Sequence, residues 1–221
     1  MRVNAMFTRK HRMCRMRILL CVVAALLTIG AARAADLTVT VTSAGQPVAD
    51  AVVMFRPAQA SHAPIHFDWP MRIAQHNIQF EPHVLVVPVG AVVSFPNLDT
   101  VRHHVYSFST GNRFELRLYG HDETRTVTFN TVGTAAIGCN IHDTMSAYVI
   151  VVDTPYAAKT DSSGQVRFTG ASGAGQLVVW DEFLRAPNMT QSVALTLPRD
   201  GEVRQAVDLV LRPAGAHQSM H

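Results

Sequence analysis

The stretch Gly138-Cys139-Asn140-Ile141-His142-Asp143-Thr144-Met145 places a thiol, an imidazole and a thioether within seven residues, spaced Cys-x2-His-x2-Met. An adjacent histidine pair, His103-His104, precedes it in the chain and can supply a second imidazole. Two imidazoles, one thiolate and a weak axial thioether form the ligand set that selects copper and holds it in a trigonal site. The sequence therefore predicts a copper site that joins this loop to one histidine of the pair.

Each donor has a structural explanation when it is taken alone. A single Cys is often a small buried apolar residue, and a single Met often fills a gap in a core. A single His such as His142 can lie on the surface or be hydrogen-bonded in the interior. The joint spacing of the donors, together with the upstream histidine pair, favours a metal site over these separate explanations.

The N-terminal segment has the three parts of a secretory signal peptide. Its first 17 residues carry six basic residues and no acidic one. An apolar run from Ile18 to Ala32 follows and ends at the small-x-small sequence Ala32-Arg33-Ala34. This pattern predicts a signal peptide over residues 1–34 and export to the periplasm. The run is shorter than the roughly 20 residues of a spanning helix, so we expect no stable membrane span after cleavage, with an uncleaved anchor as the alternative.

Removal of residues 1–34 changes both the net charge and the cysteine count. Seven of the 19 Lys and Arg residues leave and all 16 Asp and Glu residues stay, so the mature net charge is 12 − 16 = −4. The basic composition belongs to the targeting segment, and we expect no nucleic-acid partner. Cys139 becomes the single cysteine, because Cys14 and Cys21 also leave. Metal ligation accounts for a thiol that has no disulfide partner in an oxidising compartment.

The rest of the sequence predicts an all-β fold. Short alternating or β-branched runs are separated by Gly, Pro, Asn and Asp, and no long amphipathic helix is evident. Residues 56–70 contain three prolines and are expected to form a loop or linker. About seven strands within 84–152 are enough for a Greek-key sandwich with the metal loop at one end. The expected strands are residues 37–42, 48–55, 84–90, 91–95, 101–108, 113–119, 125–129, 133–138, 147–152, 165–168, 176–180 and 206–211.

A set of residues between Phe80 and Met145 carries a family resemblance: Phe80-x-Pro82…Val87-Pro88-x-Gly90-x-x-Val93-x-Phe95-x-Asn97-x-Asp99…His103-x-Val105…Gly138-Cys139-x-x-His142-x-x-Met145. This pattern resembles the cupredoxins, the type 1 blue copper proteins, and its short metal loop looks most like that of the amicyanin group. The resemblance implies a cupredoxin domain over residues 71–152 and one type 1 copper ion.

The flanks carry a second, weaker set: Val39-x-Val41…Gly45-Gln-Pro47-Val-x-x-Ala51-Val and Thr160-Asp-x-x-Gly164-x-x-x-Phe168…Leu177-x-Val-Trp180. This set resembles the transthyretin-like module that also accompanies carboxypeptidases. Together the two resemblances imply a smaller transthyretin-like β-sandwich, split between residues 35–58 and 153–212. The last residues show no periodic pattern, so we expect a disordered tail over 213–221. The whole arrangement is similar to periplasmic proteins of the methylamine-utilisation type.

The cupredoxin resemblance also distinguishes between the adjacent histidines. The first ligand of that family begins a His-Asn-Val stretch, which aligns with His103-His104-Val105. It implies the metal ligands His103, Cys139, His142 and Met145. His104 takes the place of an Asn that normally ties the two ligand segments together, so this departure puts that bond in question. His104 remains the alternative ligand, or a residue that supports the ligands through hydrogen bonds.

A site with four protein ligands has no obvious open position for a substrate, which favours one-electron transfer over bond-making chemistry. We therefore expect a periplasmic electron carrier that is not an enzyme. Its partner would be a redox protein in a weak and transient complex, with electrons passing through the edge of His142. The alternatives are a copper-handling protein without an electron-carrier role and a structural β-protein with a vestigial site.

Overall fold

The structure is a computed structural model in which residues 35–59 and 64–213 are described. The predicted signal peptide, residues 1–34, lies outside this range, as do residues 214–221 of the predicted tail. The described residues fall within one compact unit. In this part of the chain, no helix has the length and apolar character needed to cross a membrane.

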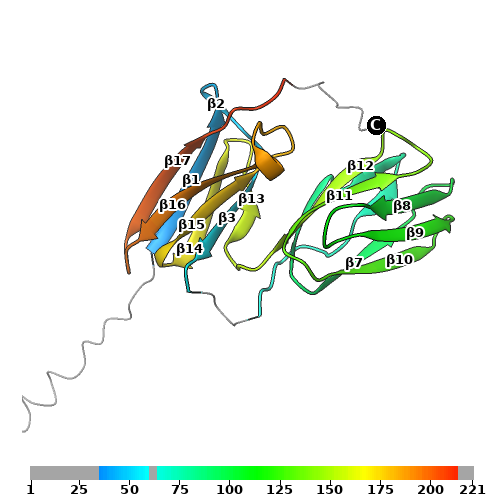
Figure 1. Ribbon diagram of the computed structural model, residues 1–221, viewed down its shortest axis with the longest axis horizontal. Coiled ribbons are helices and arrows are strands. Elements are labelled where there is room, and N and C mark those ends of the chain that lie inside the picture. Colours follow the sequence, from blue (N-terminus) through cyan, green and yellow to red (C-terminus); the bar gives the residue numbers. More distant parts are fainter. Residues whose placement is uncertain (1–34, 60–63, 214–221) are drawn as a thin grey trace, which may run out of the picture. The chain divides into compact units, whose positions relative to one another are not determined.

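The described chain consists of β-strands and their connections, which confirms the predicted all-β fold class (Figure 1). One short 3-10 turn, Pro187–Met189, is the only helical element in this range. The strands are β1 (Ala35–Ser43), β2 (Gln46–Pro47), β3 (Val52–Pro57), β4 (Ala74–His76), β5 (Gln79–Glu81), β6 (Val84–Pro88), β7 (Ala91–Pro96), β8 (His103–Ser107), β9 (Phe114–Tyr119), β10 (Thr124–Phe129), β11 (Gly133–Cys139), β12 (Ser146–Val152), β13 (Ala157–Lys159), β14 (Gln165–Ala171), β15 (Gly173–Trp180), β16 (Thr190–Leu197) and β17 (Glu202–Asp208).

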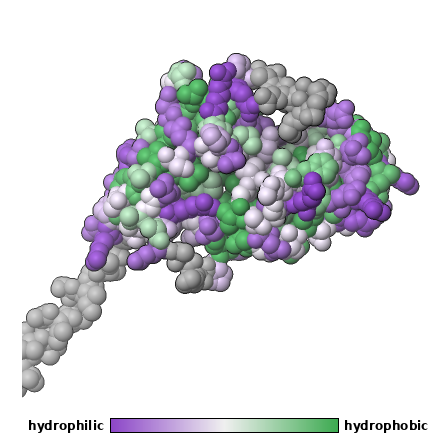
Figure 2. Space-filling view, viewed as in Figure 1, coloured by the Kyte–Doolittle hydropathy of each residue, from purple (hydrophilic) through white to green (hydrophobic). Residues whose placement is uncertain are grey.

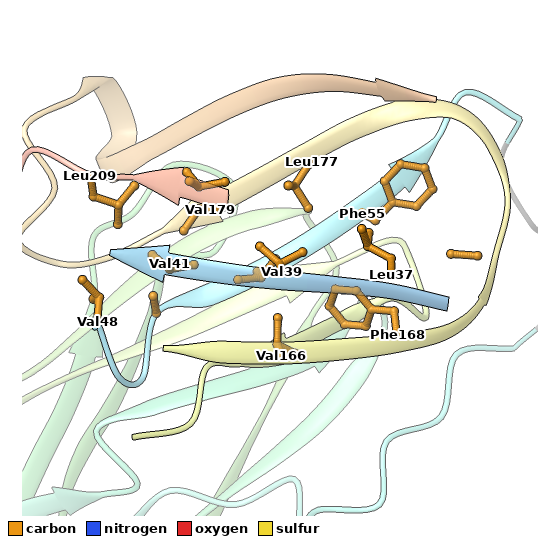
Figure 3. Packing of buried hydrophobic residues seen from close by; sticks show 14 of the residues in the cluster. Leu37, Val39, Val41, Val48, Phe55, Val166, Phe168, Leu177, Val179 and Leu209 are labelled. Carbon is orange, nitrogen blue, oxygen red and sulfur yellow. The ribbon is translucent and has the colours of Figure 1, made fainter. Parts of the chain in front are cut away.

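Strands from the two ends of the described chain form the first sandwich. One sheet has the order β14-β1-β17, with β2 paired to β1, and the other has the order β13-β3-β15-β16. Side chains of a strand point alternately to its two faces, so Leu37, Val39 and Val41 of β1 are fully buried while the residues between them are half-buried. They pack with Phe55 and Leu177 of the other sheet, and this apolar core holds the two sheets together (Figure 3).

The middle of the chain forms the second sandwich. A five-stranded sheet has the order β6-β12-β11-β8-β9, and β7 pairs with β10 in a separate two-stranded sheet. The hairpin β4-β5 lies beside the end of β7, where Gln75 of β4 forms an isolated parallel bridge with Asn97, the residue that follows β7. The core of this sandwich includes Phe95, Phe129 and Val149, and it also contains Cys139 and Met145. The ligand loop is therefore attached directly to the apolar core.

A third apolar cluster joins strands of the two sandwiches. Val84 of β6 and Ile150 of β12 share this cluster with Val52 of β3 and Trp180 of β15. Strands β4 to β12 fall within the segment 71–152, which the sequence assigns to one domain. The division into domains itself remains a prediction.

The last two strands depart from the sequence prediction. Strand β16 was not expected, and β17 begins at Glu202, earlier than the predicted strand over 206–211. Both strands lie at the edge of their sheets, and alternate residues of both are exposed. Val193, Leu195 and Leu197 of β16 alternate with exposed residues, so the sequence contained a strand signal there that was overlooked. The inward positions of β17 include Gln205, and polar residues of this kind weaken the signal of an edge strand.

Candidate metal centre

The ligand loop connects two paired strands of the five-stranded sheet. Strand β11 ends at Cys139 and strand β12 begins at Ser146, so the loop spans only six residues. The backbone amide of Met145 donates to the carbonyl of His142 at 2.9 Å, which closes a tight turn inside the loop. The sequence Cys-x2-His-x2-Met thus becomes a compact turn between two strands whose pairing is fixed.

Three of the predicted ligands lie together. The Nδ1 atoms of His103 and His142 are each 3.8 Å from Sγ of Cys139. One donor atom from each residue lies within 4.8 Å of the other two, and the two imidazole ring centroids are 5.0 Å apart. His103 is fully buried, Cys139 is a buried free thiol and His142 is half-buried. Strand β8 supplies the first residue, and the ligand loop and its preceding strand supply the others.

These separations fit a single metal ion. Bonds of about 2.1 Å to nitrogen and about 2.3 Å to sulfur, as found at zinc sites, separate the two donors by about 3.8 Å in a trigonal plane. The observed Sγ to Nδ1 distances have this value for both histidines. One thiolate and two imidazoles are also the donor set of a trigonal copper site. The residues present therefore fit a copper ion.

Met145, the fourth predicted ligand, is almost fully buried and belongs to the same apolar core as Cys139. The turn bond to His142 fixes its backbone. If copper is bound, Met145 would be the residue to hold it through a weak thioether bond, because its sulfur is soft, polarisable and desolvated.

Asp99 orients the ring of His103. Its Oδ2 atom accepts a hydrogen bond of 2.8 Å from Nε2 of His103, so the proton of the neutral ring lies on Nε2. The lone pair of Nδ1 is then directed at the ligand cluster. Burial acts to raise the pKa of Asp99, but hydrogen bonds from His103 and from the backbone of Ile78 and Asn77 outweigh it and lower the pKa. Asp99 is consequently held as a carboxylate.

Asn97 holds the turn that carries Asp99. This fully buried amide donates to the carbonyls of Val101 at 2.8 Å and Tyr119 at 3.2 Å. Its Oδ1 atom accepts the backbone amide of Asp99 at 2.9 Å. Asn97 thereby connects the end of β7 to β9 and fixes the position from which Asp99 reaches His103. The sequence pattern contains both residues, but their connection to the ligand was not foreseen.

His104 points away from the ligand cluster. Its Nε2 atom is 3.0 Å from Oε1 of Glu115 on the neighbouring strand β9. Its backbone carbonyl accepts the amide of Asn140 at 3.0 Å, which ties β8 to the start of the ligand loop. In the cupredoxin pattern, an Asn side chain at this position ties the two ligand segments together. Here the main chain of His104 ties them together instead. The structure brings His103, and not His104, beside Cys139.

Exposed apolar side chains occur in both chain segments next to the centre, the ligand loop and the Asp99 turn. Ile141, next to His142, is 48% exposed, and Leu98 and Val101 in the Asp99 turn are each more than 40% exposed. Figure 2 shows hydrophobic residues interspersed with hydrophilic ones on the exposed surface. In the described part of the chain, the three ligand residues are the only group of three or more potential metal donors.

Comparisons with known proteins gave matches among solved structures. No family model and no curated protein matches the chain. A Cu-containing nitrite reductase (NirK) from Thermus scotoductus SA-01 is 26% identical with a TM-score of 0.37, over 45% of this chain and 26% of that one. The chain thus spans about a quarter of the reductase's length.

Two matched proteins are similar over nearly their full length. A purple cupredoxin from Nitrosopumilus maritimus is 20% identical with a TM-score of 0.33, covering 37% of this chain and 98% of that one. A reduced mutant form of amicyanin is 20% identical with a TM-score of 0.36, covering 45% and 98% respectively. At TM-scores below 0.5, these likenesses do not by themselves assign the chain to a family.

Proposed function

We propose that this protein is an exported copper protein of the cupredoxin type that carries single electrons between redox partners. The observation that carries the proposal is the ligand cluster, in which both imidazole Nδ1 atoms lie 3.8 Å from the Cys139 thiol. We assign His103, Cys139, His142 and Met145 as the ligands. Bound there, a copper ion supplies a one-electron couple between Cu(II) and Cu(I).

The protein contributes a rigid and largely dry environment to this chemistry. His103 is held by Asp99, and Cys139 lies at the end of a paired strand in the apolar core. Ligands fixed in this way change position little when the charge of the ion changes, which favours fast electron transfer. The half-buried His142 offers the shortest path from the centre to solvent among the three clustered ligands. A redox protein that docks briefly at this edge would need only a small interface.

Export to the periplasm follows from the predicted signal peptide, and the oxidising compartment suits the single free thiol. We further infer that the first sandwich is a transthyretin-like module. Its contribution would be structural or in partner docking, because the ligand cluster lies wholly within the second sandwich.

Cyclic voltammetry of the copper-loaded mature chain tests this function. We expect one reversible one-electron wave, lost in Cys139→Ser. A matched control is His76→Gln, which removes a half-exposed histidine on β4 that pairs with Glu81 and should leave the wave unchanged. Tight copper binding without a reversible wave would replace the electron-carrier proposal with a copper-handling role.

A further inference from the structure

One face of the five-stranded sheet points away from the core that contains Cys139. This outer face is buried at strands β6 and β12 and open to solvent at β11, β8 and β9. On β6 and β12, its side chains Val84, Val86, Ile150 and Val152 belong to the buried third cluster. On β11, β8 and β9, the outward positions are half-buried or exposed. Because side chains alternate along each strand, these outward residues share one face: Ala136, Gly138, His104, Tyr106, Glu115 and Arg117.

Tyr106 packs against the backbone of the residue that precedes Cys139. Tyr106 and Gly138 are cross-strand partners, and a Cβ atom added at Gly138 would lie 2.8 Å from Cζ and 2.9 Å from Oη of Tyr106. A side chain at position 138 would displace the ring, so glycine is what allows this contact. The tyrosine ring therefore touches the main chain one residue away from the sulfur ligand.

Phe108 extends this contact to the surface. The ring centroids of Tyr106 and Phe108 are 4.8 Å apart. Phe108 is 68% exposed, the largest value among the exposed large hydrophobic residues of the described chain. The guanidinium of Arg113 lies 5.2 Å from the centroid of the Phe108 ring. Exposed aromatic side chains beside an arginine are the residue types that anchor protein interfaces.

The charge of this area is positive. Glu115, the acidic residue on this part of the sheet, is paired with His104. Arg113 and Arg117 are both exposed, and Arg113 stacks on Phe108. Arg113 on the exposed Phe108 ring and Arg117 on the same face of the sheet complement an acidic partner surface, and such complementarity raises the rate of encounter.

We propose that the surface formed by Tyr106, Phe108, Arg113 and Arg117 docks an acidic redox protein. This surface is separate from the His142 edge, and the Tyr106 contact with Gly138 couples it to the ligand loop. The inference rests on the proposed function, because it assigns a second partner site to the same centre. An electron would pass between the partner and the centre through the Tyr106 ring and the backbone of residues 138 and 139.

Anion binding at this surface can be tested with hexacyanochromate(III), a redox-inert paramagnetic trianion that broadens nearby NMR signals. The copper-free and Cu(I) forms of the mature chain are both used. We expect selective broadening of the signals of Phe108, Arg113 and Arg117, lost in the Arg113→Gln/Arg117→Gln double variant. Broadening confined to the His142 and Ile141 signals, or no selective broadening, would overturn the proposal.

Electron transfer is measured by stopped-flow oxidation of the Cu(I) protein with hexacyanoferrate(III). One electron leaves the protein, giving its Cu(II) form and hexacyanoferrate(II). We expect Phe108→Ala to slow this reaction at least threefold at low ionic strength, with an unchanged reduction potential. The matched control, Ile141→Ala, truncates an exposed apolar residue at the His142 edge and should slow the reaction less. Equal rates for Phe108→Ala and wild type would contradict the proposal.

Voltammetry together with these two experiments separates the electron-carrier function from the docking surface. Absence of a reversible voltammetric wave from the wild-type protein would refute the electron-carrier function. The NMR experiment on the copper-free chain would still report on the anion-binding surface. A normal wave with unchanged Phe108→Ala kinetics would refute the docking surface alone.

Discussion

Substitution of Asp99 by Asn is expected to raise the reduction potential of the copper centre. The carboxylate of Asp99 accepts a 2.8 Å hydrogen bond from Nε2 of His103, and its side chain is only 10% exposed. A buried negative charge on the far side of a ligand ring stabilises Cu(II) more than Cu(I). Asn keeps the size of the side chain and removes the charge.

The size of the shift follows from the geometry of the hydrogen bond. The 2.8 Å contact, the width of the imidazole and a metal–nitrogen bond of about 2.1 Å together place the charge about 7 Å from the ion. At an effective dielectric constant of about 20, two unit charges at this separation interact by about 2 kcal/mol. Since about 1.4 kcal/mol corresponds to 59 mV for one electron, we expect a rise of roughly 80–100 mV.

Voltammetry of the copper-loaded Asp99→Asn protein measures this shift, and the visible spectrum establishes that the ligands are retained. Glu115→Gln is the matched control, because it also removes one negative charge from a neighbour of the histidine pair. Glu115 is 55% exposed and pairs with His104, so solvent screening should keep its shift much smaller. An unchanged or lowered potential in Asp99→Asn would refute the role assigned to this carboxylate.

Three further predictions concern the axial ligand, a charged contact and the core. Met145→Leu keeps a buried apolar side chain but removes the thioether, so voltammetry should show a potential raised by about 60 mV or more; an unchanged potential would exclude Met145 as a ligand. The hydrogen bond with Glu182 is the main cause that raises the pKa of His83. The stability that this pair adds to the folded protein is therefore complete below the unfolded pKa of about 6.5, and it is lost as the pH rises through the higher folded pKa. Urea unfolding should therefore show His83→Gln less stable than wild type at pH 6, by at most about 1 kcal/mol for this half-exposed pair, and equal at pH 9; a constant difference would contradict this assignment. Phe55→Ala empties a fully buried site in the first core and should lower the free energy of unfolding by about 3–5 kcal/mol in the same assay, whereas a loss below about 1 kcal/mol would contradict the packing in Figure 3.

The sequence was most informative where local spacing alone determines structure. The Cys-x2-His-x2-Met spacing predicted a tight loop after a strand, and the loop lies between β11 and β12. Alternation predicted strands such as residues 37–42, because one face of that strand is buried in a core. Apolar residues at a regular spacing of two, with one face buried, are the strongest signal of such a strand.

The sequence was less informative where the structure depends on contacts between distant segments or on exposed edges. The bond from Asp99 to His103 depends on the turn that Asn97 holds, and no periodic pattern reports it. The partner of His104 is Glu115, which lies on another strand. The choice between the two histidines therefore required either a family resemblance or coordinates. Strand β16 carries the alternation Val193, Leu195 and Leu197, a strand signal that the prediction overlooked.

The most direct test of the account is the visible and electron paramagnetic resonance spectrum of the Cu(II)-loaded mature protein beside the Cys139→Ser variant. A trigonal site with a thiolate ligand predicts an intense thiolate-to-copper band and a narrow copper hyperfine splitting, both absent from the variant. A colourless protein, or an ordinary Cu(II) spectrum that Cys139→Ser does not change, would contradict the assignment of His103, Cys139, His142 and Met145 as a copper site.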